Sequence, residues 1–261
     1  MSVIAQAGAK GRQLHKFGGS SLADAKCYLR VAGIMKEYSQ AGDMMVVSAA
    51  GSTTNQLISW LKLSQSDRLA AHQVQQSLRR YHTELIGGLL EPAAADTLIA
   101  AFIHDLERLA GLLDGGVSEA VYAEVVGHGE VWSARLMAAV LNQLGMEAAW
   151  LDARAFLRAE RAAQPQVDEG LSYPLLQQLM AQHPNKRLVV TGFISRNQAG
   201  ETVLLGRNGS DYSATQIGAL AGASRVTIWS DVAGVYSADP RKVKDACLLP
   251  LLRLDEASEL A

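Results

Sequence analysis

The first apolar segment of the chain ends in the sequence Lys16-Phe17-Gly18-Gly19-Ser20-Ser21, and a helical pattern follows it. Glycines let backbone N–H groups approach an anion closely, and the N-terminal end of a helix carries partial positive charge. Lys16 adds a full positive charge beside these dipoles. A strand, a glycine-rich turn and a helix in this order therefore indicate a phosphate site in an α/β protein.

The spacing of this segment excludes two widespread phosphate-binding motifs. Neither G-x-x-x-x-G-K-[ST] nor G-x-G-x-x-G occurs anywhere in the chain. Because Gly-Gly-Ser-Ser after a strand is also an ordinary strand-to-helix turn, the segment becomes specific only together with other motifs.

Apolar segments of strand length lie at residues 13–17, 44–49, 148–151, 188–193, 202–205 and 225–229. Helical patterns separate most of them, at residues 22–38, 54–63, 120–144, 171–180 and 213–221. Two or three further long helices fit residues 67–113, with no strand between them. This alternation predicts βαβ units around a mainly parallel sheet.

Bulk composition favours small-molecule chemistry. The chain has 261 residues, 49% of them hydrophobic, with a net charge of −2 and a pI near 6.3. These values predict no nucleic-acid partner and no polybasic membrane anchor, and no apolar run approaches the roughly 18 residues of a membrane span. Two cysteines, Cys27 and Cys247, are too few for a disulfide framework, so we expect free thiols and a cytoplasmic location.

Two later segments carry the decisive pattern. Residues 205–213 read Leu-Gly-Arg-Asn-Gly-Ser-Asp-Tyr-Ser, and residues 229–241 read Trp-Ser-Asp-Val-Ala-Gly-Val-Tyr-Ser-Ala-Asp-Pro-Arg. Val47-Ser48-Ala49-Ala50 and the pair Gly129-Glu130 are shorter matches. With the opening motif, these segments make the chain resemble the aspartokinases of the amino acid kinase family, from about residue 12 to the C-terminus.

The resemblance implies a fold and a reaction. The expected fold is a three-layer αβα sandwich with a mainly parallel central sheet, the carbamate kinase-like fold of this family. The implied reaction transfers the γ-phosphoryl group of ATP, with Mg²⁺, to the side-chain carboxylate of L-aspartate. The product is 4-phospho-L-aspartate, the first step toward methionine, threonine and lysine.

The resemblance also assigns the residues of phosphoryl transfer. Lys16 would bridge the transferring phosphoryl group, because such sites work mainly by positioning and by neutralising charge. Asp211 would orient Lys16 or the metal-bound phosphates. The phosphates would lie among Gly18, Gly19 and Ser20.

Aspartate has its own set of expected partners. Arg207 would hold the α-carboxylate, because a planar guanidinium can bind a carboxylate at two points. Glu130, expected to open a helix, would accept hydrogen bonds from the substrate ammonium. Hydroxyl donors to the carboxylate oxygens would be Ser48, Thr54 and Ser210.

Four residues of the third motif match the family's nucleotide contacts: Ser230, Asp231, Tyr236 and Arg241. Histidines, including His15 and His128, are expected to be structural or solvated. No closed metal site is visible in the sequence, so Mg²⁺ would be held mainly by phosphate oxygens and water.

We expect residues 1–11 to form a loose extension and residues 12–261 a single kinase domain. Its two lobes would comprise residues 12–190 for the substrate and 191–261 for the nucleotide. The last residues start a helix without a cap, and a Phe-Gly-Ala-Lys segment usual in the family is absent. We therefore expect a C-terminally truncated domain. The resemblance extends to a bifunctional enzyme with regulatory and homoserine dehydrogenase domains, and it implies a homo-oligomer.

Two alternatives remain open at this stage. The chain could be a sibling kinase that acts on glutamate, acetylglutamate or carbamate, although the strings around Arg207 and Asp231 speak against it. It could instead be a binding or assembly module of a larger protein, inactive by itself.

Overall fold

The computed structural model describes residues 11–230, 232–239, 242–253 and 256. The chain divides into two compact units, residues 1–229 and 230–261. The first unit is built on a five-stranded sheet with the strand order β3-β4-β2-β1-β7. Its strands are β1 (Gln13–Phe17), β2 (Met44–Val47), β3 (Ala148–Leu151), β4 (Arg187–Thr191) and β7 (Arg225–Trp229). All neighbouring strands are parallel, which confirms the predicted sheet.

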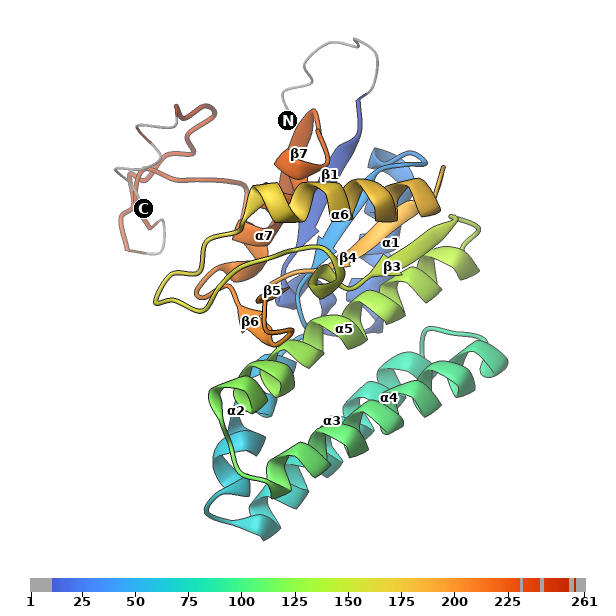
Figure 1. Cartoon of the computed structure of the whole chain (residues 1–261). Coiled ribbons are helices and arrows are strands. Elements are labelled where there is room, and N and C mark those ends of the chain that lie inside the picture. The colour runs from blue at the N-terminus through green and yellow to red at the C-terminus, as the bar shows by residue number, and fades with distance from the viewer. Residues whose placement is uncertain (1–10, 231, 240–241, 254–255, 257–261) are drawn as a thin grey trace. The chain divides into compact units, whose positions relative to one another are not determined.

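Seven α-helices lie within the described residues. They are α1 (Ala25–Tyr38), α2 (Thr53–Ser64), α3 (Arg68–Gly87), α4 (Pro92–Asp114), α5 (Glu119–Gln143), α6 (Glu169–Gln182) and α7 (Gly209–Leu220). Helices α3 and α4 pack with α2 and α5 away from the sheet (Figure 1). Two short 3-10 helices, η1 (Gly19–Leu22) and η2 (Ala153–Ala155), follow strands β1 and β3. None of the helices in the described part of the chain is long and apolar enough to cross a membrane.

Both faces of the sheet are buried, which gives the three layers. On β2, Met45 and Val47 face a core formed with α1 to α5, while Met44 and Val46 face a second core formed with α6 and α7. Successive side chains of a strand point to opposite faces, so a run of four apolar residues serves both cores. The expected three-layer αβα sandwich with a mainly parallel central sheet is therefore confirmed.

An antiparallel hairpin stands apart from the main sheet. It consists of β5 (Ile194–Arg196) and β6 (Thr202–Leu204). The sequence predicts the second of these strands but not the first, because β5 has only three residues. Its apolar residue Ile194 continues the apolar run of β4, and only the turn at Gly192 and Phe193 separates the two strands.

The start of α1 differs from the prediction. The sequence predicts a helix from residue 22, but Leu22 ends the 3-10 helix η1 and α1 begins at Ala25. Asp24 sets this boundary, because its side chain accepts a hydrogen bond of 2.8 Å from the backbone N–H of Cys27.

The expectation that Glu130 opens a helix is wrong. Helix α5 begins at Glu119, where Ser118 accepts a hydrogen bond from the backbone N–H of Val121, and Glu130 lies near its middle. Glycines at 127 and 129 suggest a helix boundary, but they serve packing instead. A Cβ on Gly127 would lie 2.5 Å from Ile194, and one on Gly129 would lie 2.7 Å from Ala49.

The second unit contains a short antiparallel pairing between residues 235–237 and 247–249. Tyr236 and Leu248 form a β-bridge, flanked by backbone hydrogen bonds from Ser237 to Cys247 and from Leu249 to Val235. The predicted nucleotide contacts Asp231 and Arg241 lie outside the described residues.

Candidate functional site

A pocket of about 380 Å³ lies where β1, β2 and β4 end. The carboxyl ends of parallel strands meet at one edge of a sheet, and open α/β sheets bind their ligands there. Turns after these strands, the middle of α5 and the start of α7 all contribute to its wall. Eight predicted site residues line it: Lys16, Gly18, Gly19, Ser48, Thr54, Glu130, Ser210 and Asp211.

Lys16 forms an ion pair in this pocket. Its Nζ lies 2.6 Å from Oδ1 of Asp211, in the first turn of α7. The Lys16 side chain is 10% exposed, whereas that of Asp211 is 38% exposed and so remains partly hydrated. Strand β1 lies between β2 and β7, which holds the backbone of Lys16 rigidly. The pocket therefore presents a fixed ammonium whose direction is set by a carboxylate.

The two glycines after β1 have different roles. A Cβ on Gly19 would lie 2.8 Å from the carbonyl oxygen of Ala49, so only glycine lets the turn after β1 approach the turn after β2. The backbone N–H of Gly51 donates to the carbonyl of Gly19 at 3.0 Å and joins the two turns. A Cβ on Gly18 would meet only the Lys16 ammonium, at 3.6 Å, so this glycine leaves space beside the charge.

Glu130 is buried on α5 and lines the same pocket. Burial raises the pKa of its carboxyl group to about 8, an effect that the backbone N–H of Ala49 partly offsets. Within the described residues its Oε2 has no hydrogen-bond partner. A buried carboxyl group without a cation is costly to ionise, so this position suits a ligand that brings its own positive charge.

Gly129 allows helix α5 to come close enough to the pocket for Glu130 to line it. A Cβ there would lie 2.7 Å from the Ala49 side chain and 3.1 Å from that of Thr53. Because Gly129 has no side chain, α5 packs directly on the turn that carries Ser48 and leads into α2. Glu130 consequently reaches the pocket together with Ser48 and Thr54.

The start of α7 forms the opposite wall. Asn208 precedes the helix with a positive φ of 55°, and Gly206 has a φ of 80°. A Cβ on Gly209 would lie 2.6 Å from the ring of Phe193, so the close approach again requires glycine. The positively polarised end of α7 is next to the pocket, beside Ser210.

Phe193 is a lining residue that the sequence analysis missed. It adopts a positive φ of 67°, which is strained for a bulky residue, typically by about 1–3 kcal/mol. Its N–H donates to Ser213 Oγ at 3.1 Å, and its carbonyl accepts from the Leu205 N–H at 2.8 Å. In the sequence it is the last residue of an apolar run, where nothing distinguishes it from a core residue. Other lining residues not predicted are Ala49, Gly51, Asn55, Gly206, Asn208 and Gly209.

Two predicted residues of the first unit do not line the pocket. Ser20, in η1, and Arg207, between Gly206 and Asn208, are both exposed. The neighbours of Arg207 do line the pocket, so its side chain starts at the pocket rim. Ser230 and Tyr236 belong to the second unit. The roles of these four residues stay predictions.

Metal-binding groups are sparse. Across the described ranges, no cluster of three His, Cys, Asp or Glu side chains could hold a metal ion. His15 is buried and its Nδ1 accepts a hydrogen bond of 3.1 Å from Trp229 Nε1, while burial lowers its pKa. His128 lies between Asp105 and Glu124, at 3.7 and 3.6 Å. Both histidines have structural contacts, as expected.

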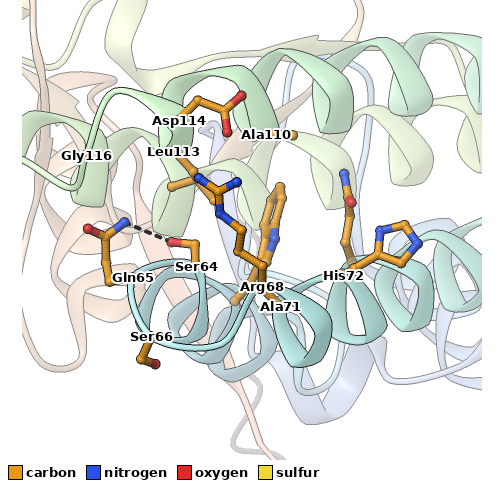
Figure 2. A pocket seen from close by; sticks show the side chains of 12 residues that line it. Ser64, Gln65, Ser66, Arg68, Ala71, His72, Ala110, Leu113, Asp114 and Gly116 are labelled. Carbon is orange, nitrogen blue, oxygen red and sulfur yellow. Dashed lines mark hydrogen bonds between the residues drawn. The ribbon is translucent and has the colours of Figure 1, made fainter.

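A larger hollow lies elsewhere, among the helices. It measures about 540 Å³ and is bounded by the turn between α2 and α3 and by the end of α4 (Figure 2). Arg68 and Asp114 extend into it from opposite sides, and Trp60 is among its lining residues. None of the predicted site residues lines this hollow. The smaller pocket is therefore the candidate site, because residues from distant parts of the chain converge there.

The sequence model of the amino acid kinase family matches residues 11–261. The chain belongs to the amino acid kinase family. It is 87% identical over 261 residues to bifunctional aspartokinase/homoserine dehydrogenase 2 of Escherichia coli K12, covering all of this chain and 32% of that protein. The chain thus spans about a third of that relative's length.

Solved structures agree with this similarity. The fold resembles that of E. coli aspartokinase III in complex with aspartate and ADP, with a TM-score of 0.82 and 28% identity over 90% of this chain and 52% of that one. The complex of the same enzyme with lysine and aspartate gives a TM-score of 0.80 at 29% identity, over 90% and 53% of the two chains. The predicted resemblance to aspartokinases is confirmed.

Proposed function

We propose that this chain catalyses transfer of the γ-phosphoryl group from ATP to the side-chain carboxylate of L-aspartate, forming 4-phospho-L-aspartate. One observation carries the proposal: the Lys16–Asp211 ion pair and the buried carboxyl of Glu130 line a single pocket. The relatives named aspartokinase, and the related structure that holds aspartate and ADP, support the same substrates.

Glu130 would bind the ammonium group of aspartate. A buried carboxyl group without a cationic partner gains most from a ligand cation, because the cation offsets the cost of ionising it. This contact selects amino acids over plain dicarboxylic acids. Ser48, Thr54 and Ser210 would donate hydrogen bonds to the carboxylate oxygens of the substrate.

Arg207 would bind the α-carboxylate of aspartate from the pocket rim. A guanidinium held at two points on the attacking carboxylate would reduce its nucleophilicity, so the α group is the better partner. Its exposed position leaves the side chain room to turn toward a bound substrate.

Lys16 would neutralise charge on the phosphoryl group as it passes from ADP to the carboxylate oxygen. The attacking carboxylate and the phosphates are all negative, so a fixed cation between them lowers the barrier. Asp211 holds the ammonium in place. Backbone groups of Gly18 and Gly19, with the Ser20 hydroxyl, would contact the phosphates.

The nucleotide would enter as its magnesium complex. Of the lining residues, only Glu130 and Asp211 carry carboxylates, and Asp211 is already paired with Lys16. Phosphate oxygens and water would therefore supply most of the Mg²⁺ ligands. The nucleoside and phosphates would also be contacted by four residues of the third motif, Ser230, Asp231, Tyr236 and Arg241. All four belong to residues 191–261, the nucleotide lobe expected from the sequence. Homo-oligomerisation, a cytoplasmic location and fusion to regulatory and dehydrogenase domains are further parts of the proposal.

A coupled assay of ADP release tests the proposed function. The purified protein is supplied with Mg-ATP and, in separate reactions, with aspartate, glutamate, acetylglutamate, carbamate or homoserine. We expect turnover with aspartate well above that with the other acceptors. Faster turnover with glutamate, acetylglutamate or carbamate would assign a sibling activity. Aspartate binding without ADP release from any acceptor would instead indicate a binding module.

A further inference from the structure

A groove separate from both the candidate pocket and the hollow among the helices lies at the start of α6, beside the end of β5. Its volume is about 500 Å³, within the range of small-ligand pockets, roughly 300–1,000 Å³. Five of its lining residues matter here: Arg158, Leu171, Pro174, Leu175 and Arg196. None of the residues that line the candidate kinase site lines this groove.

The backbone places the two arginines next to each other. Residues 158 and 196 form an isolated parallel β-bridge, in which the N–H of Arg196 donates to the carbonyl of Leu157 at 3.0 Å. The N–H of Ala159 donates to the carbonyl of Arg196 at 3.2 Å. Two positive side chains therefore start from adjacent positions and line the same groove.

Neither guanidinium has an acidic partner within the described residues. Arg158 donates instead to three backbone carbonyls, those of Arg154 at 2.9 Å, Ala155 at 3.2 Å and Leu157 at 3.4 Å. Burial and the charge of Arg196 both lower the pKa of Arg158. Like charges placed together without a counter-charge repel each other, so an anion between them would be stabilising.

Three acidic residues near the groove in the sequence have contacts away from its two arginines. Glu160 accepts a hydrogen bond of 2.9 Å from the backbone N–H of Gln198, and Asp168 accepts one of 2.9 Å from that of Leu171. Glu201 pairs with Arg161 at 3.2 Å. None of these three carboxylates pairs with Arg158 or Arg196, so both guanidinium groups can act on a ligand.

The wall on α6 is apolar, whereas Asn197 and Gln198 line another part of the groove. Leu171 is 45% exposed, and Pro174 and Leu175 follow it along α6 within the same groove. An apolar wall favours a ligand with a hydrocarbon part. It also favours a single negative charge over the two of a phosphate, since each charge must lose water on entering.

We propose that this groove binds a small aliphatic monocarboxylate, with its carboxylate between Arg158 and Arg196 and its hydrocarbon chain against Leu171, Pro174 and Leu175. The exposed guanidinium of Arg196 offers parallel N–H groups that match the two oxygens of a carboxylate. Arg158 adds its positive charge, because its Nη1 and Nη2 already donate to backbone carbonyls. The site goes beyond the proposed kinase function, because the groove would hold neither aspartate nor ATP.

Titration calorimetry with sodium octanoate tests the proposal directly on the protein. Octanoate should bind in a one-to-one ratio, and Arg196→Gln should weaken binding by about tenfold or more, as loss of a charge-assisted contact does. Arg196 is exposed, so this change should leave folding intact. Arg30→Gln, an exposed arginine on α1, is the matched control and should bind octanoate like the parent.

Three other probes separate the parts of the site. Octanol and octylammonium should bind at least about tenfold more weakly than octanoate if the arginines recognise a carboxylate. Inorganic phosphate should also bind more weakly, because it lacks the hydrocarbon part. Leu171→Ser, at an exposed position, should weaken octanoate binding and leave phosphate unaffected. Equal octanoate binding by the parent and Arg196→Gln, or equal binding of octanol, would overturn the proposal. These experiments measure binding and not phosphoryl transfer, so their result does not depend on the proposed kinase reaction.

Discussion

The ammonium of Lys16 lies 2.6 Å from a carboxylate oxygen of Asp211. Lys16 comes from β1 at the start of the chain, and Asp211 comes from the first turn of α7, so the contact joins two distant motifs. The transferring phosphoryl group would therefore meet an ammonium whose position is set by both β1 and α7.

Lys16→Ala should abolish most phosphoryl transfer and leave the fold intact. Removing a group that stabilises transition-state charge typically lowers kcat by about 10²–10³-fold. Asp211 is partly hydrated, so the loss of its partner should cost little stability. Steady-state kinetics should show a larger loss in kcat than in substrate binding. Lys62→Ala, at an exposed position of α2, is the control. Activity within about threefold of the parent would remove Lys16 from the mechanism.

Stability should depend on pH through Glu130. Its pKa is raised from 4.5 to about 8 in the folded protein. The folded state therefore keeps a proton that the unfolded state releases, and this stabilising effect is fully present below pH 4.5 and is lost as pH rises through about 8. Urea unfolding of the ligand-free protein should show this decline, by at most about 1.4 kcal/mol per pH unit. Glu130→Gln should have a flatter profile, and parallel profiles would contradict the assignment.

The affinity for aspartate should also depend on the ionisation of Glu130, but it should rise with pH where stability falls. An ammonium ligand needs the ionised carboxylate, so affinity should rise with pH up to about 8, the pKa of Glu130. Calorimetry at neutral pH, in buffers of different ionisation enthalpy, should show proton release on binding. Glu130→Gln should bind aspartate weakly and without this proton release. Proton release by the variant equal to that of the parent would assign the proton to another group.

Gly129→Ala should disturb the site through packing. A Cβ there would lie 2.7 Å from Ala49, so α5 must move or the turn after β2 must yield. Overpacking of this kind usually costs about 1–3 kcal/mol. The KM for aspartate should also rise, because Glu130 is the next residue.

Gly33→Ala in α1 is the matched control, since a Cβ at Gly33 meets no atom within 4 Å. Alanine should stabilise this helix by about 0.5–1 kcal/mol. Thermal unfolding of both variants would distinguish packing from helix propensity. If Gly129→Ala were also stabilising, the close contact with the turn after β2 would be wrong.

Arg207→Lys should raise the KM for aspartate far more than the KM for ATP. Lysine keeps the positive charge but cannot make a planar two-point contact with a carboxylate. Initial-rate kinetics with each substrate varied in turn measures both values. Equal increases would place Arg207 on the phosphate side or in a structural role.

Much of this architecture follows from local sequence. Strands β1, β3 and β7 have the predicted bounds, because short apolar segments between polar turns have few other ways to bury their side chains. Site residues that belong to contiguous motifs, such as Lys16, Gly19 and Asp211, are also accessible from sequence, since a turn of fixed chemistry carries them.

Only the tertiary structure decided where the motifs meet. The strand order places β1 between β2 and β7, and this arrangement brings the turn after β1 to that after β2. Phe193 enters the pocket through a strained backbone that no local preference favours. Glu130 occupies the middle of α5 because Gly127 and Gly129 pack against Ile194 and Ala49. Local propensity treats a helical glycine as a break costing about 1 kcal/mol, whereas close packing between segments distant in sequence outweighs that cost.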